Sequence, residues 1–139
     1  METKLERIDP CPFCKSDFYR LSESDRENIL VVKDVNPVTP GHRLVVPRVH
    51  YESLLELTPT LVGELFQVAA KVAREAVSSG ADGFNLGIND GAVAGQSVPH
   101  VHIHVIPRYL GDVENPFGGV RGVIAARQRY SKQKFSFDN

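Results

Sequence analysis

Four segments of the chain carry hydrophobic patterns that are typical of β-strands. Residues 28–33 contain four consecutive aliphatic side chains, and residues 42–47 resume the pattern after a turn that holds two prolines. In residues 84–89 and 101–107 apolar side chains recur at every second position, which is the period of a strand. We expect the first two segments to form a β-hairpin with a long loop, and the polar residues 22–27 before them to form a solvated loop.

One long helix is predicted between Thr58 and Gly80. Thr58 is a suitable N-cap, Pro59 suits the first helical position, and Gly80 is typical of a residue that ends a helix. Strands in hairpin order with a separate helix predict an α+β fold with an antiparallel sheet. Residues 123–126 form a short apolar run that predicts either a further strand or part of an arm. The apolar positions that recur at helical spacing are Leu61, Leu65, Val68, Val72 and Ala76.

Composition and charge narrow the class of protein. The chain has 139 residues, a length typical of one domain, and its 16 basic and 17 acidic side chains give a net charge of −1. This balance argues against nucleic-acid binding, because proteins that bind the phosphate backbone are usually basic. No apolar run is long enough to cross a bilayer, and residues 1–7 lack the apolar core of a signal peptide. We therefore expect a cytoplasmic protein that binds neither nucleic acid nor membrane, with a loosely held polar end at residues 131–139.

Three of the five histidines, His100, His102 and His104, occupy alternate positions of the last predicted strand. Side chains at such positions project from one face about 7 Å apart, so the three imidazoles are expected to form a row. Imidazole can attack phosphorus or carbonyl centres, carry protons near neutral pH, or bind a metal. Two less specific interpretations are an exposed strand face that happens to be polar and a metal site made of histidines alone. The second is disfavoured because neighbours on a strand diverge too far to close a tight site.

A loop of glycine and polar residues precedes these histidines. Gly91 and Gly95 expose backbone amides, while Gln96 and Ser97 add a carboxamide and a hydroxyl. Such groups suit a phosphate or another oxyanion. By itself the loop is weak evidence, but its position directly before the histidines favours a phosphate site.

The only two cysteines lie three positions apart, at Cys11 and Cys14. A C-P-x-C motif resembles the redox pair of glutaredoxins, but that site needs a strand before it, and here Asp9-Pro10 precedes the pair. The same spacing supplies half of a tetrahedral zinc site, for which His50 and His100 are candidates for the other half. An unmetallated thiol pair is the third alternative.

Residues 95–108, Gly-Gln-Ser-Val-Pro-His-Val-His-Ile-His-Val-Ile-Pro-Arg, resemble the signature of the histidine triad (HIT) family of nucleotide hydrolases and transferases. The resemblance extends upstream through residues 34–37 and 40–50, and covers about residues 11 to 108. It implies a five-stranded antiparallel sheet with one long and one short helix in a single domain over residues 1–139, with a C-terminal arm over 109–139. It also implies a homodimer whose sheets join.

The resemblance further implies the role of each candidate site residue. His102 would be the nucleophile, while His104 and His42 would position its imidazole and the phosphate oxygens. Gln96 and Ser97 would contact the phosphate and assist the leaving group. The remaining residues of the nucleotide site would be Phe13, Val35 and Leu44 for the base, Asp34 for the ribose and Asn89 for the phosphate.

For the cysteines, the resemblance to a branch of the family that has C-x-x-C near its start implies a closed structural zinc site. Its ligands would be Cys11, Cys14, His50 and His100, and no organic cofactor is implied. The implied activity is hydrolysis of a nucleoside phosphoramidate or dinucleoside polyphosphate at the α-phosphate, through a nucleotidyl-histidine, with a purine nucleotide or its conjugate as ligand. The alternatives are a nucleotide-binding regulatory module and a nucleotidyl transferase that uses the same site.

Overall fold

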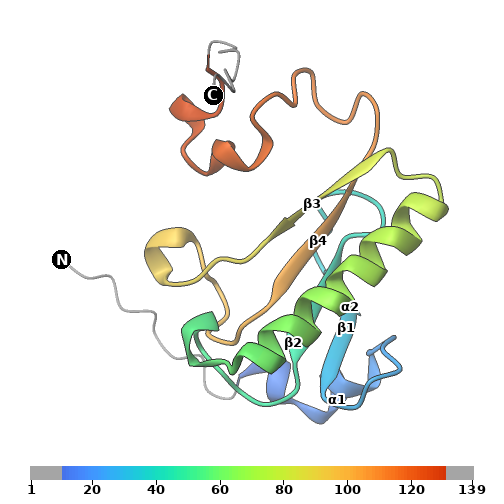
Figure 1. Cartoon of the computed structure of the whole chain (residues 1–139), viewed down its shortest axis with the longest axis vertical. Helices are drawn as coiled ribbons and strands as arrows, with labels where there is room; N and C mark the ends of the chain where they lie inside the picture. Colours follow the sequence, from blue (N-terminus) through green and yellow to red (C-terminus); the bar gives the residue numbers. More distant parts are fainter. Residues whose placement is uncertain (1–10, 131–139) are drawn as a thin grey trace, which may run out of the picture.

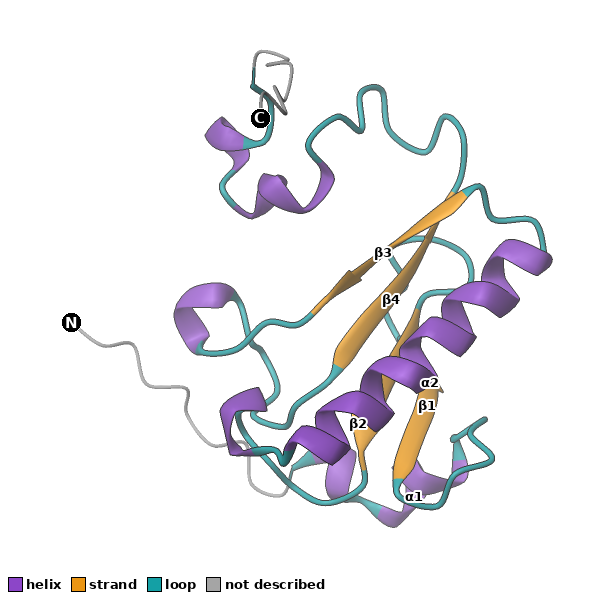
Figure 2. Ribbon diagram, viewed as in Figure 1, coloured by secondary structure: helices purple, strands orange, loops and turns teal. Residues whose placement is uncertain are grey.

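A computed structural model describes residues 11–130 of the chain. Four antiparallel strands form one sheet in the order β1-β2-β4-β3, and the long helix α2 lies across one face of it (Figure 1). The strands are β1 (Ile29–Lys33), β2 (Arg43–Pro47), β3 (Gly83–Gly87) and β4 (Ile103–Arg108). The short helix α1 (Ser16–Arg20) lies near the ends of β1 and β2, as the view coloured by secondary structure also shows (Figure 2).

The helix α2 (Pro59–Ser78) confirms the helix expected from the sequence. The Thr58 hydroxyl caps it by accepting a hydrogen bond from the Leu61 amide at 3.2 Å, and Pro59 occupies the first turn. Burial of its apolar stripe against the sheet forms the first of two cores. The residues of this core include Leu65, Val68, Ala69 and Ala73 from α2, and Ile29, Val31, Val45, Ile103 and Val105 from the strands.

A second, smaller core lies on the opposite face of the sheet. It contains Leu30 and Val32 from β1, Leu44 and Val46 from β2, and Phe13 from the one-turn 3₁₀-helix η1 (Pro12–Cys14). Because β1 is covered on both faces, its four aliphatic side chains are all buried, which explains why the sequence reads as a continuous apolar run. The histidines of the candidate site lie on this second face, away from α2.

The expectation of a fifth strand is wrong for the part of the chain that the structure describes. Residues 123–126 do not pair with the sheet but belong to the 3₁₀-helices η4 (Gly119–Val123) and η5 (Ala125–Arg127). Along the free edge of β1, Glu23 donates one backbone hydrogen bond to the Val31 carbonyl, and the Ser22 hydroxyl accepts from the Val31 amide. One backbone bond and one side-chain bond cap the edge without building a ladder.

Residues 109–130 form an arm that leaves the end of β4 and folds on itself (Figure 1). The Arg121 guanidinium lies 4.5 Å from the centroid of the Tyr130 ring, and the Phe117 ring lies 5.1 Å from the same centroid. Gly118 has a φ of 91°, and a Cβ there would collide with the Gln128 carbonyl, so this turn requires glycine. The apolar run within this arm is not buried against the sheet, since Val123 is 80% and Ile124 62% exposed. Residues 1–7 and 131–139, about which the sequence raised expectations, lie outside the described part of the chain.

Two strand boundaries differ from the expected ones by two residues, and the others by at most one. β3 ends at Gly87, not at residue 89, and β4 begins at Ile103, not at residue 101. The β2–β4 ladder holds its last pair at Val45 and Ile103, and the Val101 amide donates instead to the Tyr51 carbonyl at 2.7 Å. Within residues 11–130, no helix is long and apolar enough to cross a membrane.

Candidate active site

The five histidines separate into two clusters, and the triad is divided between them. His100 turns toward His50, with ring centroids 4.9 Å apart. His102 and His104 stay together at 5.0 Å, and His42, from the residue before β2, joins them at 5.2 Å from His104. The expected single row is therefore wrong for the ring of His100. The reason is that the ladder of β4 starts only at Ile103, so the backbone of the first two histidines is not held in a strand.

The ring of His102 is oriented by a single backbone contact. Its Nδ1–H donates to the carbonyl of His100 at 2.8 Å. A neutral imidazole carries one ring proton, so the Nε2 atom of His102 keeps its lone pair. His102 is only 5% exposed, so the ring that carries this lone pair is almost fully buried.

A chain of hydrogen bonds fixes the protonation of the other two imidazoles. The Val38 amide donates to Nδ1 of His42 at 3.0 Å, so the proton of that ring must lie on Nε2. Nε2 of His42 lies 2.9 Å from Nδ1 of His104 and donates to it. The ring proton of His104 then lies on its own Nε2. The backbone amide of Val38 thus sets the direction of the whole chain, and His104 becomes a donor.

Asp34 lies beside the pair formed by His42 and His104. Its Oδ2 is 3.4 Å from Nε2 of His42 and 3.8 Å from Nδ1 of His104, while its Oδ1 accepts from the Asn36 amide at 2.8 Å. The donor atoms of these three side chains lie within 4.8 Å of one another. A cation there would need the lone pair of Nε2 in His42, which the Val38 contact converts into an N–H. The arrangement therefore fits a proton chain better than a metal site.

Burial keeps the three histidines of this cluster neutral near pH 7. Desolvation, together with the charges of His102 and His42, lowers the pKa of His104 to about 4, and Asp34 opposes the shift. Burial also lowers the pKa of His102, against the carbonyl of His100 and the charge of Asp34, which raise it. The pKa of His42 is lowered by burial and raised by Asp34. The cluster is suited to nucleophilic attack by a neutral imidazole.

A groove of ≈ 400 Å³ opens beside this cluster. Gly87 pairs with His104 in the β3–β4 ladder and has open space at its Cβ position, so no side chain covers the imidazole there. The groove therefore leaves room for a ligand at the histidines. Its lining includes Asp34, His42, Asn85, Asn89, His104 and Ile106.

The two polar residues of the glycine loop occupy different environments. The carboxamide of Gln96 accepts from the Gly91 amide at 2.8 Å and donates to the carbonyls of Glu52 at 2.9 Å and Val98 at 3.1 Å. Its polar atoms are thus used inside the protein, where they shape the loop. Ser97 is exposed, so its hydroxyl can reach a ligand. A phosphate contact from either residue stays a prediction.

The residues expected at the base pocket also divide. Phe13 and Leu44 belong to the second core and are almost fully buried. Val35 is 87% exposed at the tip of the hairpin loop. Of these three side chains, Val35 has the largest surface free for a base.

Cys11, Cys14, His50 and His100 converge as one cluster. The Nδ1 atom of His100 lies 3.5 Å from both cysteine sulfurs and 3.2 Å from Nδ1 of His50. The Cys14 sulfur lies 3.3 Å from Nδ1 of His50. Zn–S bonds of about 2.3 Å and Zn–N bonds of about 2.0 Å in a tetrahedron place ligand atoms roughly 3.3–3.8 Å apart. The cluster fits zinc in donor type, number and spacing.

The surroundings of this cluster also suit a metal. Nε2 of His100 donates to the Pro47 carbonyl at 2.7 Å, which leaves Nδ1 as a lone pair directed at the cysteines. A hydrogen bond from the distal nitrogen is typical of histidines that bind metals. Nε2 of His50 has no hydrogen-bond partner among the described residues and lies 3.7 Å from the nearest Glu52 oxygen.

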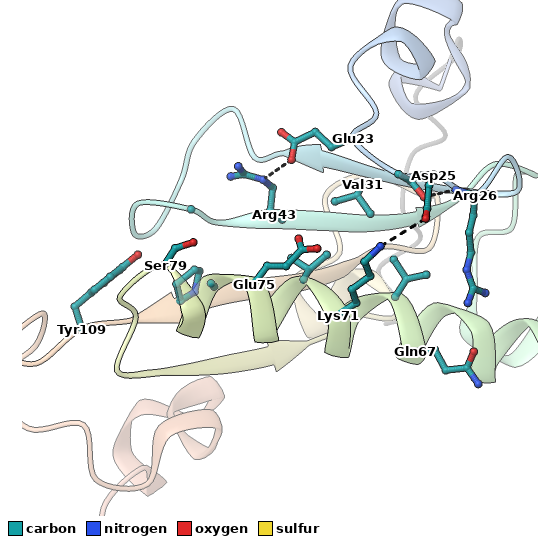
Figure 3. A pocket seen from close by; sticks show the side chains of 16 residues that line it. Glu23, Asp25, Arg26, Val31, Arg43, Gln67, Lys71, Glu75, Ser79 and Tyr109 are labelled. Carbon is teal, nitrogen blue, oxygen red and sulfur yellow. Dashed lines mark hydrogen bonds and ion pairs between the residues drawn. The ribbon is translucent and has the colours of Figure 1, made fainter.

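A larger hollow of ≈ 470 Å³ lies elsewhere, between α2 and the loop over β1 (Figure 3). Four of its charged side chains form ion pairs, Arg43 with Glu23 at 3.2 Å and Lys71 with Asp25 at 3.6 Å. It lies on the α2 side of the sheet, opposite the histidines, and shows no concentration of one charge. We therefore do not identify it as the reaction site.

Some residues that shape the groove could not be found from the sequence. The hairpin loop is tied to the end of β4 by the Thr39 hydroxyl, which donates to the Pro107 carbonyl at 2.5 Å, and by the Tyr109 hydroxyl, which donates to the Pro40 carbonyl at 2.8 Å. These contacts hold the loop whose Val38 amide orients His42. A backbone amide has no signature in the sequence, so nothing there could have identified this role.

Comparison with known proteins gives consistent matches. The model of the family described as HIT domain matches residues 24–111. An uncharacterised HIT-like protein of Methanocaldococcus jannaschii is 39% identical over 117 residues, which cover 81% of this chain and 91% of that protein. The Adenylylsulfatase HINT3 of Arabidopsis thaliana is 39% identical over 104 residues, or 70% of this chain and 52% of that protein.

A third relative and a solved structure extend the comparison. The asymmetrical bis(5'-nucleosyl)-tetraphosphatase of Schizosaccharomyces pombe is 46% identical over 81 residues, or 57% of this chain and 44% of that protein. The chain thus spans about half the length of the two relatives whose names state an activity. A Zn-bound histidine triad family protein of Mycobacterium smegmatis superposes with a TM-score of 0.69 at 36% identity, covering 76% of this chain and 80% of that one.

Proposed function

This chain belongs to the HIT domain family, and we propose that it hydrolyses nucleotide conjugates at the α-phosphorus through a covalent nucleotidyl group on His102. The candidate substrates are nucleoside phosphoramidates and dinucleoside polyphosphates. The observation that carries the proposal is the contact of Nδ1–H of His102 with the His100 carbonyl, which leaves Nε2 as the free nucleophilic atom of a neutral ring.

In the first step, the lone pair of Nε2 of His102 attacks the α-phosphorus, and the bond from phosphorus to the leaving group breaks. The leaving group takes the electron pair of that bond and a proton from solvent water, for which the exposed Ser97 hydroxyl is the proposed route; the water that attacks in the second step returns one proton to solvent. The Nε2–H of His104 donates to a phosphate oxygen and stabilises the charge that develops on it. His42 holds His104 in this donor form through the 2.9 Å contact.

In the second step, water attacks the phosphorus of the nucleotidyl-histidine. The P–N bond breaks, a nucleoside monophosphate leaves, and His102 returns to its neutral form. The sum of the two steps is addition of one water to the conjugate. Division into two displacements avoids the need for a metal at the phosphorus, because the positively charged nucleotidyl-imidazolium releases a neutral imidazole, which is a good leaving group.

The nucleotide is proposed to lie along the groove, with its phosphate at His104 and Asn89 and its ribose hydroxyls on Asp34. Asn89 lines the groove together with Asp34, which supports this direction. Val35 would cover the base, with Leu44 and Phe13 behind it in the core. Gln96 is proposed to keep the loop amides in place near the phosphate, since its own carboxamide is engaged.

We also propose that the Cys2His2 cluster binds one structural zinc ion and that the chain forms a homodimer. The spacing of the four donor atoms supports zinc. The edge of β3 supports the dimer, since among residues 11–130 this strand pairs only with β4 and its Phe84 is 47% exposed. Zinc would contribute architecture only, because four protein ligands leave no position for water.

The test is release of adenosine monophosphate from adenosine phosphoramidate, diadenosine tetraphosphate and adenylylsulfate, compared side by side with wild type and His102→Ala. We expect at least one substrate to be cleaved by wild type, no turnover by the variant, and nucleotide binding retained by both. Turnover by His102→Ala would disprove the assigned nucleophile. Binding without any turnover by wild type would favour the regulatory module, and formation of a nucleoside diphosphate when phosphate is added would identify a transferase.

A further inference from the structure

The ring of Phe13, which lies between the two cysteines, packs directly against the proposed nucleophile. We infer that Phe13 is a positioning residue that holds the imidazole of His102 in its reactive orientation. This inference deepens the proposed function and rests on it for its kinetic consequence alone. The resemblance assigns Phe13 to the base pocket, and the structure in addition places its ring against His100 and His102.

The geometry places Phe13 against both neighbouring histidines. Its ring centroid lies 5.2 Å from that of His102, with an interplanar angle of 86°, and 5.7 Å from that of His100, at 69°. These are edge-to-face contacts, which are favourable between aromatic rings. Phe13 is 8% exposed and stacks on Phe18 at 4.6 Å on another side, so it is itself firmly held.

A single hydrogen bond does not fix an imidazole. The Nδ1–H contact with the His100 carbonyl can be lost by rotation about the last side-chain torsion, which has broad minima for histidine. Packing must therefore hold the ring. The rings that pack against His102 are Phe13 and His104, the latter at 5.0 Å and itself part of the reacting cluster. Of these two rings, Phe13 is the one that packs against His102 without taking part in the proposed reaction.

Phe13 owes its own position to the Cys2His2 cluster. It lies in η1, a single turn closed by the Cys14 amide, which donates to the Cys11 carbonyl at 3.1 Å. The sulfurs at both ends of this turn face Nδ1 of His100. The cluster therefore reaches His102 by two routes, the ring of Phe13 and the carbonyl of His100. Any ion that closes the cluster would fix both.

The test replaces Phe13 by leucine and compares it with Phe18→Leu in the full-length, zinc-loaded protein. Phe18 stacks on Phe13, is partly buried against the same core and has no ring contact with a histidine among the described residues, so it is a matched control for lost apolar packing. The first measurement is the long-range ¹H–¹⁵N spectrum of the histidine rings. We expect wild type and Phe18→Leu to show His102 as the single Nδ1–H tautomer, and Phe13→Leu to show a mixture.

The second measurement is steady-state kinetics on whichever nucleotide conjugate wild type cleaves. Misplacement of a reacting group by about 1 Å can cost roughly a hundredfold in rate, so we expect kcat of Phe13→Leu to fall about 10- to 100-fold with KM changed less than about twofold. Phe18→Leu should lose less than about threefold in kcat by the same reasoning. A base-pocket role alone would raise KM and leave the tautomer of His102 unchanged.

The inference is overturned if Phe13→Leu keeps the single tautomer of His102 and loses no more kcat than Phe18→Leu. Should Phe13→Leu fail to fold, Phe13→Met, which fills a similar volume without a ring, takes its place in both measurements. If wild type cleaves no conjugate, the proposed function fails, and the ring spectra still decide the role of Phe13.

Discussion

His100 accepts the Nδ1–H of His102 on its backbone carbonyl at 2.8 Å while its own ring faces the sulfurs of Cys11 and Cys14 at 3.5 Å. One residue therefore belongs to both clusters, through its backbone in one and its side chain in the other. The position of the free nitrogen of His102 depends on where the cysteine cluster holds His100.

Cys14→Ser should abolish stoichiometric zinc binding. Loss of one thiolate from a four-ligand site leaves three ligands, so we expect zinc content to fall from about one ion per chain to below about 0.2 and the thermal midpoint to fall by several degrees, because zinc binding contributes to folding. Elemental analysis and calorimetry provide the measurements. Lys15→Ala, an exposed neighbour, is the control. Full zinc occupancy in Cys14→Ser would show that the cluster is not the metal site.

His42→Ala should reduce turnover without affecting zinc. The change removes the donor that holds Nδ1 of His104 at 2.9 Å, so His104 no longer has a fixed tautomer. We expect kcat to fall about 100-fold, within the range usual for loss of a group that controls proton position. Zinc content should equal that of wild type, since His42 lies in the other cluster. Unchanged kcat would contradict the proton chain.

Stability should decline as the pH falls below about 6.5. Burial lowers the pKa of His104 to about 4. Between pH 6.5 and 4 this histidine therefore binds a proton in the unfolded chain but stays neutral in the folded protein. The unfolded state then carries more protons, and the free energy of unfolding decreases with decreasing pH. Urea unfolding at several pH values measures this. Replacement of His104 by Asn should flatten the slope, and an unchanged slope would refute the assignment.

Gln96→Ala and Ser97→Ala should separate stability from activity. The first change leaves a backbone amide and two carbonyls without their side-chain partner. We expect a loss of about 1–3 kcal/mol in the free energy of unfolding, the usual penalty for unsatisfied polar groups. Ser97 is exposed, so its loss should leave stability unchanged and lower kcat. Equal stability of Gln96→Ala and wild type would mean that solvent replaces the carboxamide.

The groove end of β4 is held by an ion pair that the sequence alone left uninterpreted. Arg108 donates to Asp112 through two nitrogens, at 2.8 Å each, and to the Asn85 side chain at 2.7 Å. This contact holds the pKa of the Asp112 carboxyl well below its usual range. Arg108 therefore anchors the start of the arm and is not free to bind phosphate.

Local patterns were sufficient for most of the fold. The cap at Thr58 and the apolar stripe of α2 depend on residues three or four positions apart, so the helix could be predicted correctly from the sequence. The strands β1 and β2 follow from their aliphatic runs, and their antiparallel pairing from the turn between them. Residues 123–126 are also apolar, but they lie in a separate arm of 3₁₀ turns, where Val123 and Ile124 stay largely exposed.

The sequence by itself determined which side chains are present for chemistry: three alternating histidines, a C-x-x-C pair and two further histidines. Only the tertiary structure decided how they divide, with the ring of His100 facing the cysteines and the ring of His102 beside His104. It also decided that the Val38 amide sets the tautomer of His42 and that the Gln96 carboxamide forms hydrogen bonds with backbone groups. The physical reason is that spacing fixes the type and order of the groups, whereas burial and hydrogen bonds from distant segments fix which atom carries the proton.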